Sequence, residues 1–520
     1  MRKWLLGASC AVALLLGGLA AAGWIAARRF EPFVRQQAIA YLQDRFGTGV
    51  AVRELHVSVA FLSPWHPRSA RLRLWGEGLK IGSLVTVGQF RMDTELGALW
   101  EQPRRIRDVR LEALELNIRP RLASAEVEKG AGTPAPEAVV VQRMEARSAL
   151  VRIFPADAAK LPREDEVQHV VLTGAQPGKG FQYEAELRNP KPPGTVQVAG
   201  SFGPWRRDDP GETPISGAYT FTGADLGAFR TIAGILDSTG RFEGPLRRIA
   251  VHGETRTPQF RLAGGNALPL TTRFDSIVDG TSGDTFLQPV RARLGSTDIV
   301  ARGRIVRPPG PKARSIVLDV AVDQGRIEDL VRLAVKASQP FLQGSIDLRT
   351  KMQILPVAGR DMRQRLLLDG NFSMDESQFS GGSVQQKIDM LSRRAQGQPK
   401  NQEIADVFSS LRGGFAMEDG ELRFSDLVFQ VPGAAIHLHG TYGIYSEQID
   451  LHGVARLQAK ASQTMSGWKR LALKPIDPLL SRAGAGTLLP IQITGTRAEP
   501  HFGLDRGRKG QANAADRAPR

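Results

Sequence analysis

Cysteine is nearly absent from this chain, which has one in 520 residues, Cys10, and Cys10 lies in the N-terminal apolar segment. The rest of the chain therefore cannot be held by disulfides, which suits an oxidising compartment without proving one. Long basic runs are absent as well, although the net charge is +16. Nucleic-acid grooves interleave basic and aromatic residues, and this chain has no such cluster. We therefore expect no nucleic-acid partner.

Motifs of catalysis are also lacking. There is no G-x-S-x-G elbow and no paired carboxylate pattern. Asp279-Gly280-Thr281 resembles the end of a phosphotransfer motif, but Ile277 stands where the nucleophilic aspartate is needed. The glycine-rich segment 174–180 has the wrong spacing for a phosphate loop and reads as a loop. We expect no enzyme, no catalytic residue and no cofactor.

Three histidines near the C-terminus are the residues whose pattern is most similar to that of a metal site. His437 and His439 would share one face of a strand, and His452 follows. No acidic ligand stands at a recognisable spacing, so the sequence favours histidines that face solvent or a groove rim over a metal site.

One apolar run long enough for a membrane is present, from Trp4 to Ala27, and none follows it. At 1.5 Å per residue it spans about 36 Å as a helix, more than the roughly 30 Å of a bilayer core. The small residues 20–22 would also suit a signal-peptidase site, but Trp24 and Ile25 continue the apolar run beyond them. We predict an uncleaved anchor over residues 1–29, which leaves all later residues on one side of the membrane.

Most of the remaining chain shows the alternation typical of short β-strands. Examples are residues 55–61, 72–74, 114–118, 196–198, 316–320, 366–368 and 436–438. Helical periodicity is limited to residues 31–46, 226–236, 327–335, 384–391 and 404–411. Gly 55 and Pro 32 indicate frequent turns.

A motif that occurs twice suggests repeated strand-turn-strand units. The spacing Ile-x-Val-x-Gly-x4-Pro-x-Phe at residues 249–260 returns, with Ile for Val, at residues 491–502. A strand, a glycine bend and a proline that withholds one N–H would suit a sheet edge or a hairpin boundary. Such units predict an elongated, stacked β architecture.

Several segments resemble the AsmA-like family of envelope proteins. The resemblance rests on turn and strand patterns at residues 200–205, 209–214, 224–226, 278–285, 415–422, 432–433 and 439–441, and it covers most of the chain. It implies an inner-membrane-anchored protein whose periplasmic part is a long, curved antiparallel sheet with an apolar groove. It also implies transport of glycerophospholipid toward the outer membrane, with a possible protein partner at the outer membrane or in the periplasm.

Without the resemblance, the residues leave open whether the apolar face lines a lipid groove or the core of a sandwich. An antiparallel sheet has one apolar face that something must cover, and the expected helices are few. An acyl chain could cover it, as could a second sheet in a sandwich. Our groove candidates are Leu72, Leu74, Ile436 and Leu438, because each pair shares one face of its strand.

The sequence thus predicts a mainly β protein with few helices and one N-terminal transmembrane helix. The leading functional interpretation is binding of membrane lipid, and the alternative is a scaffold for outer-membrane protein assembly that pairs through exposed strands. The expected segments are the anchor at 1–29, an amphipathic helix and N-terminal β region at 30–128, a linker at 129–137, a central β region at 138–350, a C-terminal region at 351–505 and a disordered tail at 506–520.

Overall fold

The computed structural model describes most of the chain between Val50 and Asp505 as β-strands in two compact units. Unit 1 comprises residues 1–222, 239–251 and 278–283, and unit 2 comprises residues 223–238, 252–277 and 284–520. The described residues are 36, 40, 50–60, 70–95, 97–99, 101, 103–118, 139–155, 161–176, 178–206, 208–262, 265–311, 313–334, 340, 342–357, 362–380, 382–396, 407–444, 446–458, 487–496 and 499–505.

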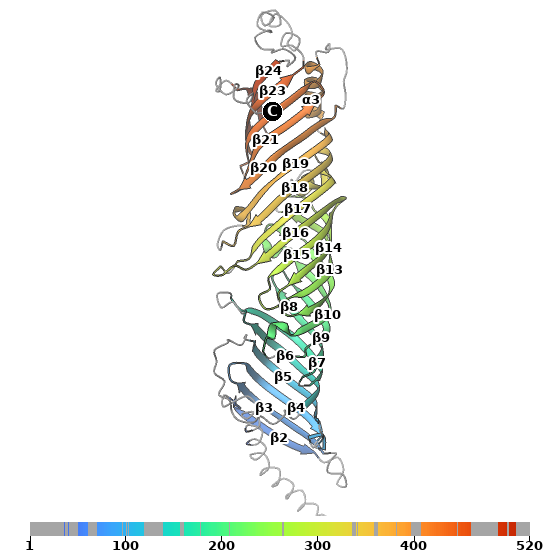
Figure 1. Cartoon of the computed structure of the whole chain (residues 1–520), viewed down its shortest axis with the longest axis vertical. Helices are drawn as coiled ribbons and strands as arrows, with labels where there is room; N and C mark the ends of the chain where they lie inside the picture. The colour runs from blue at the N-terminus through green and yellow to red at the C-terminus, as the bar shows by residue number, and fades with distance from the viewer. Residues whose placement is uncertain are drawn as a thin grey trace, which may run out of the picture. The chain divides into compact units, whose positions relative to one another are not determined.

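Unit 1 is a curved sheet in which strands that follow one another in the chain lie side by side (Figure 1). Its described strand pairs are antiparallel except for β5 and β6, which run parallel. The strands that belong to it throughout are β1 (Val50–Ala51), β2 (Glu54–Ala60), β3 (Arg71–Ile81), β4 (Val85–Glu95), β5 (Arg104–Ile118), β6 (Val139–Ile153), β7 (Arg163–Ala175), β8 (Phe181–Pro190) and β9 (Pro193–Phe202).

Four strands contribute residues to both units. They are β10 (Pro214–Asp225), β12 (Ile235–Pro245), β13 (Ile249–Leu262) and β14 (Leu268–Val278). The two-residue β11 (Ile232–Ala233) belongs to unit 2. Four short 3-10 turns complete the described elements: η2 (Gly97–Leu99), η3 (Pro210–Glu212), η4 (Leu226–Phe229) and η5 (Met362–Arg365).

Unit 2 continues the same pattern with antiparallel pairs between successive strands from β15 to β25. Its strands are β15 (Thr285–Leu294), β16 (Thr297–Val306), β17 (Ser315–Arg326), β18 (Leu342–Ile354), β19 (Leu366–Phe379), β20 (Ser409–Glu418), β21 (Glu421–Val431), β22 (Ala434–Gly443), β23 (Gln448–Leu457), β24 (Thr487–Thr496) and β25 (Pro500–Leu504). The expected boundary between residues 350 and 351 falls within β18, and that division stays a prediction.

Two of the expected helices are confirmed: α2 (Ile327–Ala334) and α3 (Gly382–Ala395). The helix expected at residues 226–236 is wrong, because η4 ends at Arg230 in a left-handed conformation and β11 and β12 follow. The helix expected at 404–411 is wrong over its described last residues: β20 begins at Ser409, and pairing with β19 and β21 holds Leu411 in the sheet.

The two copies of the repeated motif fold differently. The second copy forms the predicted hairpin, in which Gly495 of β24 lies opposite Pro500 of β25. The first copy has no bend and is the single strand β13. Side-chain hydrogen bonds to Glu254 from β12 and between Thr255 and Thr272 of β14 show neighbours on both sides, and these neighbours keep β13 extended.

The predicted N-terminal anchor, the linker at 129–137 and the tail at 506–520 lie outside the described residues. Of the amphipathic helix expected at 31–46, the structure describes Gln36 and Ala40, and both have helical backbone. Among the described residues, no helix has the length and apolar character needed to cross a bilayer.

Candidate functional site

The four predicted groove residues lie in two strands, one in each unit. Leu72 and Leu74 are in β3 of unit 1, where they are 5% and 8% exposed. Ile436 and Leu438 are in β22 of unit 2, where Ile436 is half-buried and Leu438 is buried. Each pair shares one face of its strand, and in both units that face is apolar.

In unit 1 the apolar face extends from β2 across every strand to β8. Leu72 and Leu74 form a buried cluster with Leu55, and half-buried apolar residues of β2 and β4 pack against it. One cross-strand row of this face consists of Val57, Leu74, Met92, Val109, Met144, Leu172 and Tyr183. Burial at the end of the row raises the pKa of Tyr183 to about 12.

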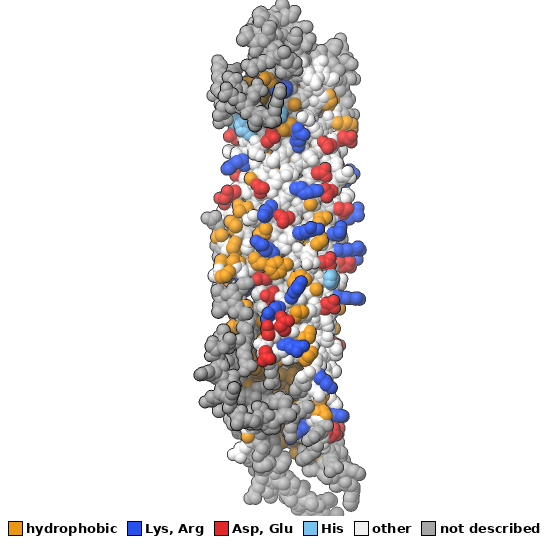
Figure 2. Space-filling view, in the orientation of Figure 1, with side chains coloured by type: hydrophobic (Ala, Val, Ile, Leu, Met, Phe, Trp, Pro, Cys, Tyr) orange, Lys and Arg blue, Asp and Glu red, His pale blue; other side chains and the backbone are white. Residues whose placement is uncertain are grey.

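The opposite face of unit 1 is charged. Asp93 of β4 accepts hydrogen bonds from Arg73 at 2.8 Å and from Arg91 at 3.0 Å. Figure 2 shows basic and acidic side chains interleaved over the strands, which is the pattern expected of a face in contact with water.

Glu145 of β6 is the most buried carboxylate on this charged face. Its Oε1 lies 3.1 Å from Nε2 of His169, and Arg143 and Arg147 donate to its carboxylate at 3.3 and 3.1 Å. Burial alone would raise the pKa of Glu145, but these three partners outweigh burial and lower the pKa to about 2. Ion pairs between neighbouring residues therefore stabilise the arrangement of side chains on the charged face.

In unit 2 the apolar face includes three neighbouring cross-strand rows, and a further row that contains Leu368, Met417, Leu422 and Ile449 continues the same face beyond them. The helix-side row is Ile346, Met374, Leu411, Phe429, Ile436, Ala455 and Leu489. The middle row is Ile299, Val322, Leu348, Phe372, Gly413, Leu427, Leu438, Gly453, Ile491 and Leu504. The outer row is Ala301, Val320, Thr350, Gly370, Phe415, Phe424, Gly440, Leu451, Ile493 and Phe502.

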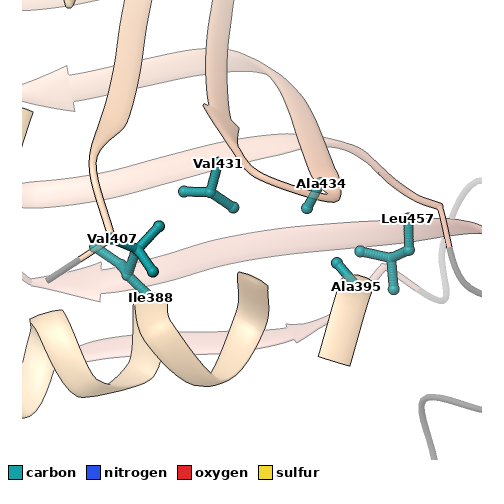
Figure 3. Packing of buried hydrophobic residues seen from close by; sticks show 6 residues of the cluster. All are labelled: Ile388, Ala395, Val407, Val431, Ala434 and Leu457. Carbon is teal, nitrogen blue, oxygen red and sulfur yellow. The ribbon is translucent and has the colours of Figure 1, made fainter. Parts of the chain in front are cut away.

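The helices α2 and α3 pack on one margin of this apolar face. The cluster around α2 joins Ile327 and Val331 to Ile346 and Met374. The cluster around α3 joins Ile388 and Ala395 to strand residues that include Val431, Ala434 and Leu457, as Figure 3 shows. The helix-side row is thus covered by helix.

The outer row lies beyond both helix clusters. Phe415 and Phe424 are half-buried, and Phe502 at the end of the row is 66% exposed. Phe415 contacts Phe372 of the middle row, with ring centroids 6.3 Å apart. Seven of the ten residues of this row are apolar, the other three are Thr350, Gly370 and Gly440, and none of the ten belongs to a helix cluster. This row is our candidate functional site.

The sequence signal for this row is the same alternation that identified Leu438, although Phe415 and Phe424 are not among the groove residues predicted from it. Phe415 shares one face of its strand with Gly413 and Met417, and Phe424 shares that face with Leu422, because residues two apart in a strand point to the same side. What no single strand reveals is that these residues meet, because the alignment depends on the register of each pair.

Two surface cavities lie on the charged side of the strands. One, of about 600 Å³ in unit 2, is lined by residues that include Asp323, Asp347, Arg349 and Arg412. The other, of about 450 Å³ in unit 1, is lined by residues that include His169, Glu184 and Glu186. The lining is mixed, since Leu348 and Phe372 of the middle row also line the first cavity, and Val171, Val198 and Ala218 also line the second.

The C-terminal histidines also lie on the charged side. His437 and His439 are exposed and point away from the face of Leu438, so the prediction that they face solvent is confirmed. His452 lies 3.0 Å from both Asp505 and Asp450, and the hydrogen bond with Asp505 is the main cause of its raised pKa. Among the described residues, no group of three or more potential ligands is placed to hold a metal ion.

No protein-family model, curated protein or solved structure matches this chain.

Proposed function

We propose that this protein binds the acyl chains of membrane lipids along its apolar sheet face. The observation that carries the proposal is the outer row of unit 2, in which six half-buried apolar side chains and the exposed Phe502 lie on seven of ten successive strands outside the helix clusters. Contact of such a row with water is unfavourable. Burial of an acyl chain against it contributes about 0.8 kcal/mol of binding free energy for each CH₂. An acyl chain also needs no precise hydrogen-bond geometry.

The cellular setting of the proposal comes from the sequence. The apolar run at residues 4–27 supports an anchor in the inner membrane, and the resemblance to AsmA-like proteins supports a periplasmic location for the strands. In this setting the protein supports phospholipid transport to the outer membrane or its maintenance. Glycerophospholipid is the proposed ligand.

The alternative function is a scaffold for outer-membrane protein assembly, and one observation favours it. β25 is the last described strand, it pairs with β24, and its residues are exposed. An exposed strand edge can accept a strand from a client protein.

Adjacent residues of β20 allow a matched test of the lipid proposal. Phe415 belongs to the outer row, and Ala416 lies on the opposite, charged face. We expect Phe415→Glu to abolish co-purification of phospholipid, because a carboxylate on the acyl path must lose its hydration, and Ala416→Glu to leave it unchanged. Native mass spectrometry measures the bound lipid, and circular dichroism checks the fold.

If Phe415→Glu fails to fold, a photo-crosslinking residue at position 415 or 416 gives the same comparison without a charge. Lipid adducts at position 415 and none at 416 are the expected result. Equal adducts at both positions, or protein clients in place of lipid, would contradict the proposal.

A further inference from the structure

The apolar face of unit 2 ends at β25 with two large apolar side chains in water. Phe502 and Leu504 are 66% and 53% exposed. They lie opposite Ile493 and Ile491 of β24, so they are the last members of the outer and middle rows. A ligand that lies along these rows therefore reaches solvent at this strand.

A lysine from α3 lies over this end. The Nζ atom of Lys387 is 5.9 Å from the centroid of the Phe502 ring, within the range of a cation–π contact. Among the ion pairs between described residues, Lys387 forms none with a carboxylate. An anion placed beside the apolar ring would therefore lie next to this ammonium group.

The packing of α3 fixes the position of Lys387. Ile388 and Ala395 are buried against the strands, and Gln385 donates to the carbonyl of Val407 at 3.0 Å and accepts from the N–H of Phe379 at 3.0 Å. Lys387 itself is exposed. The helix is held through its buried side, which leaves Lys387 at the rim of the apolar face.

We propose that β25 is the site where a phospholipid enters or leaves the apolar face, with its phosphate held by Lys387 and an acyl chain on Phe502 and Leu504. This inference rests on the proposed function and adds the position of the head group. A cation next to exposed apolar side chains is complementary to an amphiphile that carries phosphate at one end and hydrocarbon at the other. A client strand fits this edge less well, because β25 has five residues and begins with a proline that lacks an N–H donor.

The test places a photo-crosslinking residue at position 502 in the full chain and incubates the protein with phosphatidylglycerol vesicles. We expect lipid adducts at 502 and few at position 501, which lies on the other face of the same strand. Lys387→Glu should reduce the adducts at 502 several-fold, and Lys387→Arg should restore them. With diacylglycerol, which lacks the phosphate, Lys387→Glu should have no effect.

Crosslinking at position 415 as well as at position 502 distinguishes a failure of this inference from a failure of the proposed function. Adducts at 415 without adducts at 502, or adducts at 502 that Lys387→Glu leaves unchanged, would overturn the entry site while the proposed function stands. Protein adducts at 502, from a client or a second copy, would overturn it in favour of strand pairing. The absence of lipid adducts at both positions would overturn both proposals.

Discussion

Gly453 of β23 shows how single residues permit the curvature of the unit 2 sheet. It belongs to the middle row, between Leu438 of β22 and Ile491 of β24. A Cβ atom at this position would lie 1.8 Å from the carbonyl oxygen of His437, which is backbone and cannot move aside alone. Gly440 of β22 is similar, because its Cβ would lie 2.0 Å from the carbonyl oxygen of Asp450. Glycine at these positions lets neighbouring strands approach at a bend.

Gly453→Ala is therefore expected to lower the free energy of unfolding by about 1–3 kcal/mol, the usual range for forcing an extra methyl group into a packed site. Gly503→Ala is the control on the same sheet, since its Cβ would meet no atom closer than 3.6 Å. Urea denaturation followed by circular dichroism measures both variants. Equal stability of the two would show that the strands accommodate the methyl group by a small shift.

At the scale of elements, the helices are tied to the sheet by specific polar contacts as well as by apolar packing. Asp329 of α2 is 7% exposed, and its Oδ2 accepts hydrogen bonds from the N–H and hydroxyl of Ser296 and from the hydroxyl of Thr297, at 2.8 to 2.9 Å. These donors lie at the start of β16. The carboxylate thus fixes α2 over the helix-side row.

Replacing the Asp329 carboxylate tests whether it holds α2 to the sheet. Asp329→Ala removes the acceptor of the exposed Ser296 and the shorter of two hydrogen bonds from the buried Thr297 hydroxyl, and should cost about 1–2 kcal/mol of stability. We also expect amide hydrogens of α2 to exchange faster, because the helix loses its attachment at this end. Arg332→Ala, an exposed change in the same helix, should alter neither the urea midpoint nor the exchange. Unchanged exchange in Asp329→Ala would mean that the apolar cluster around Ile327 and Val331 holds α2 without it.

At the scale of the whole chain, both units have the same two-sided design, with an apolar face and a charged face. The charged face carries interleaved basic and acidic side chains, many of them joined in ion pairs. Such a face is suited to contact with water, and the opposite face presents apolar side chains.

The topology of the chain is a prediction at this scale. Because Trp4–Ala27 is the one long apolar run, alkaline phosphatase fused after residue 520 should be active if the strands lie in the periplasm. A fluorescent protein that folds in the cytoplasm should stay dark at the same position. The opposite pair of results would place the strands in the cytoplasm and remove the setting of the proposed function.

The sequence by itself determined the strand-rich class of the fold, the two helices and the two-sided strands. Alternation at Leu72 and Leu74, or at Ile436 and Leu438, is a local property with a period of two residues, so it can be read without knowing any partner strand. The periodicity of α2 and α3 is local in the same way. The sequence left open whether the apolar face is covered by a second sheet. In the structure, the described strands all belong to one sheet.

Only the tertiary structure decided which apolar residues meet. The outer row joins Phe415, Phe424 and Phe502 through the register of separate strand pairs, and a shift by one residue in any pair would turn its side chains to the other face. Neighbouring strands also overrode local signals, since β20 replaced part of an expected helix and β13 stayed straight where the same motif forms a hairpin at β24 and β25. The position of Lys387 over Phe502 depends on helix packing across more than one hundred residues of chain, about which a local pattern carries no information.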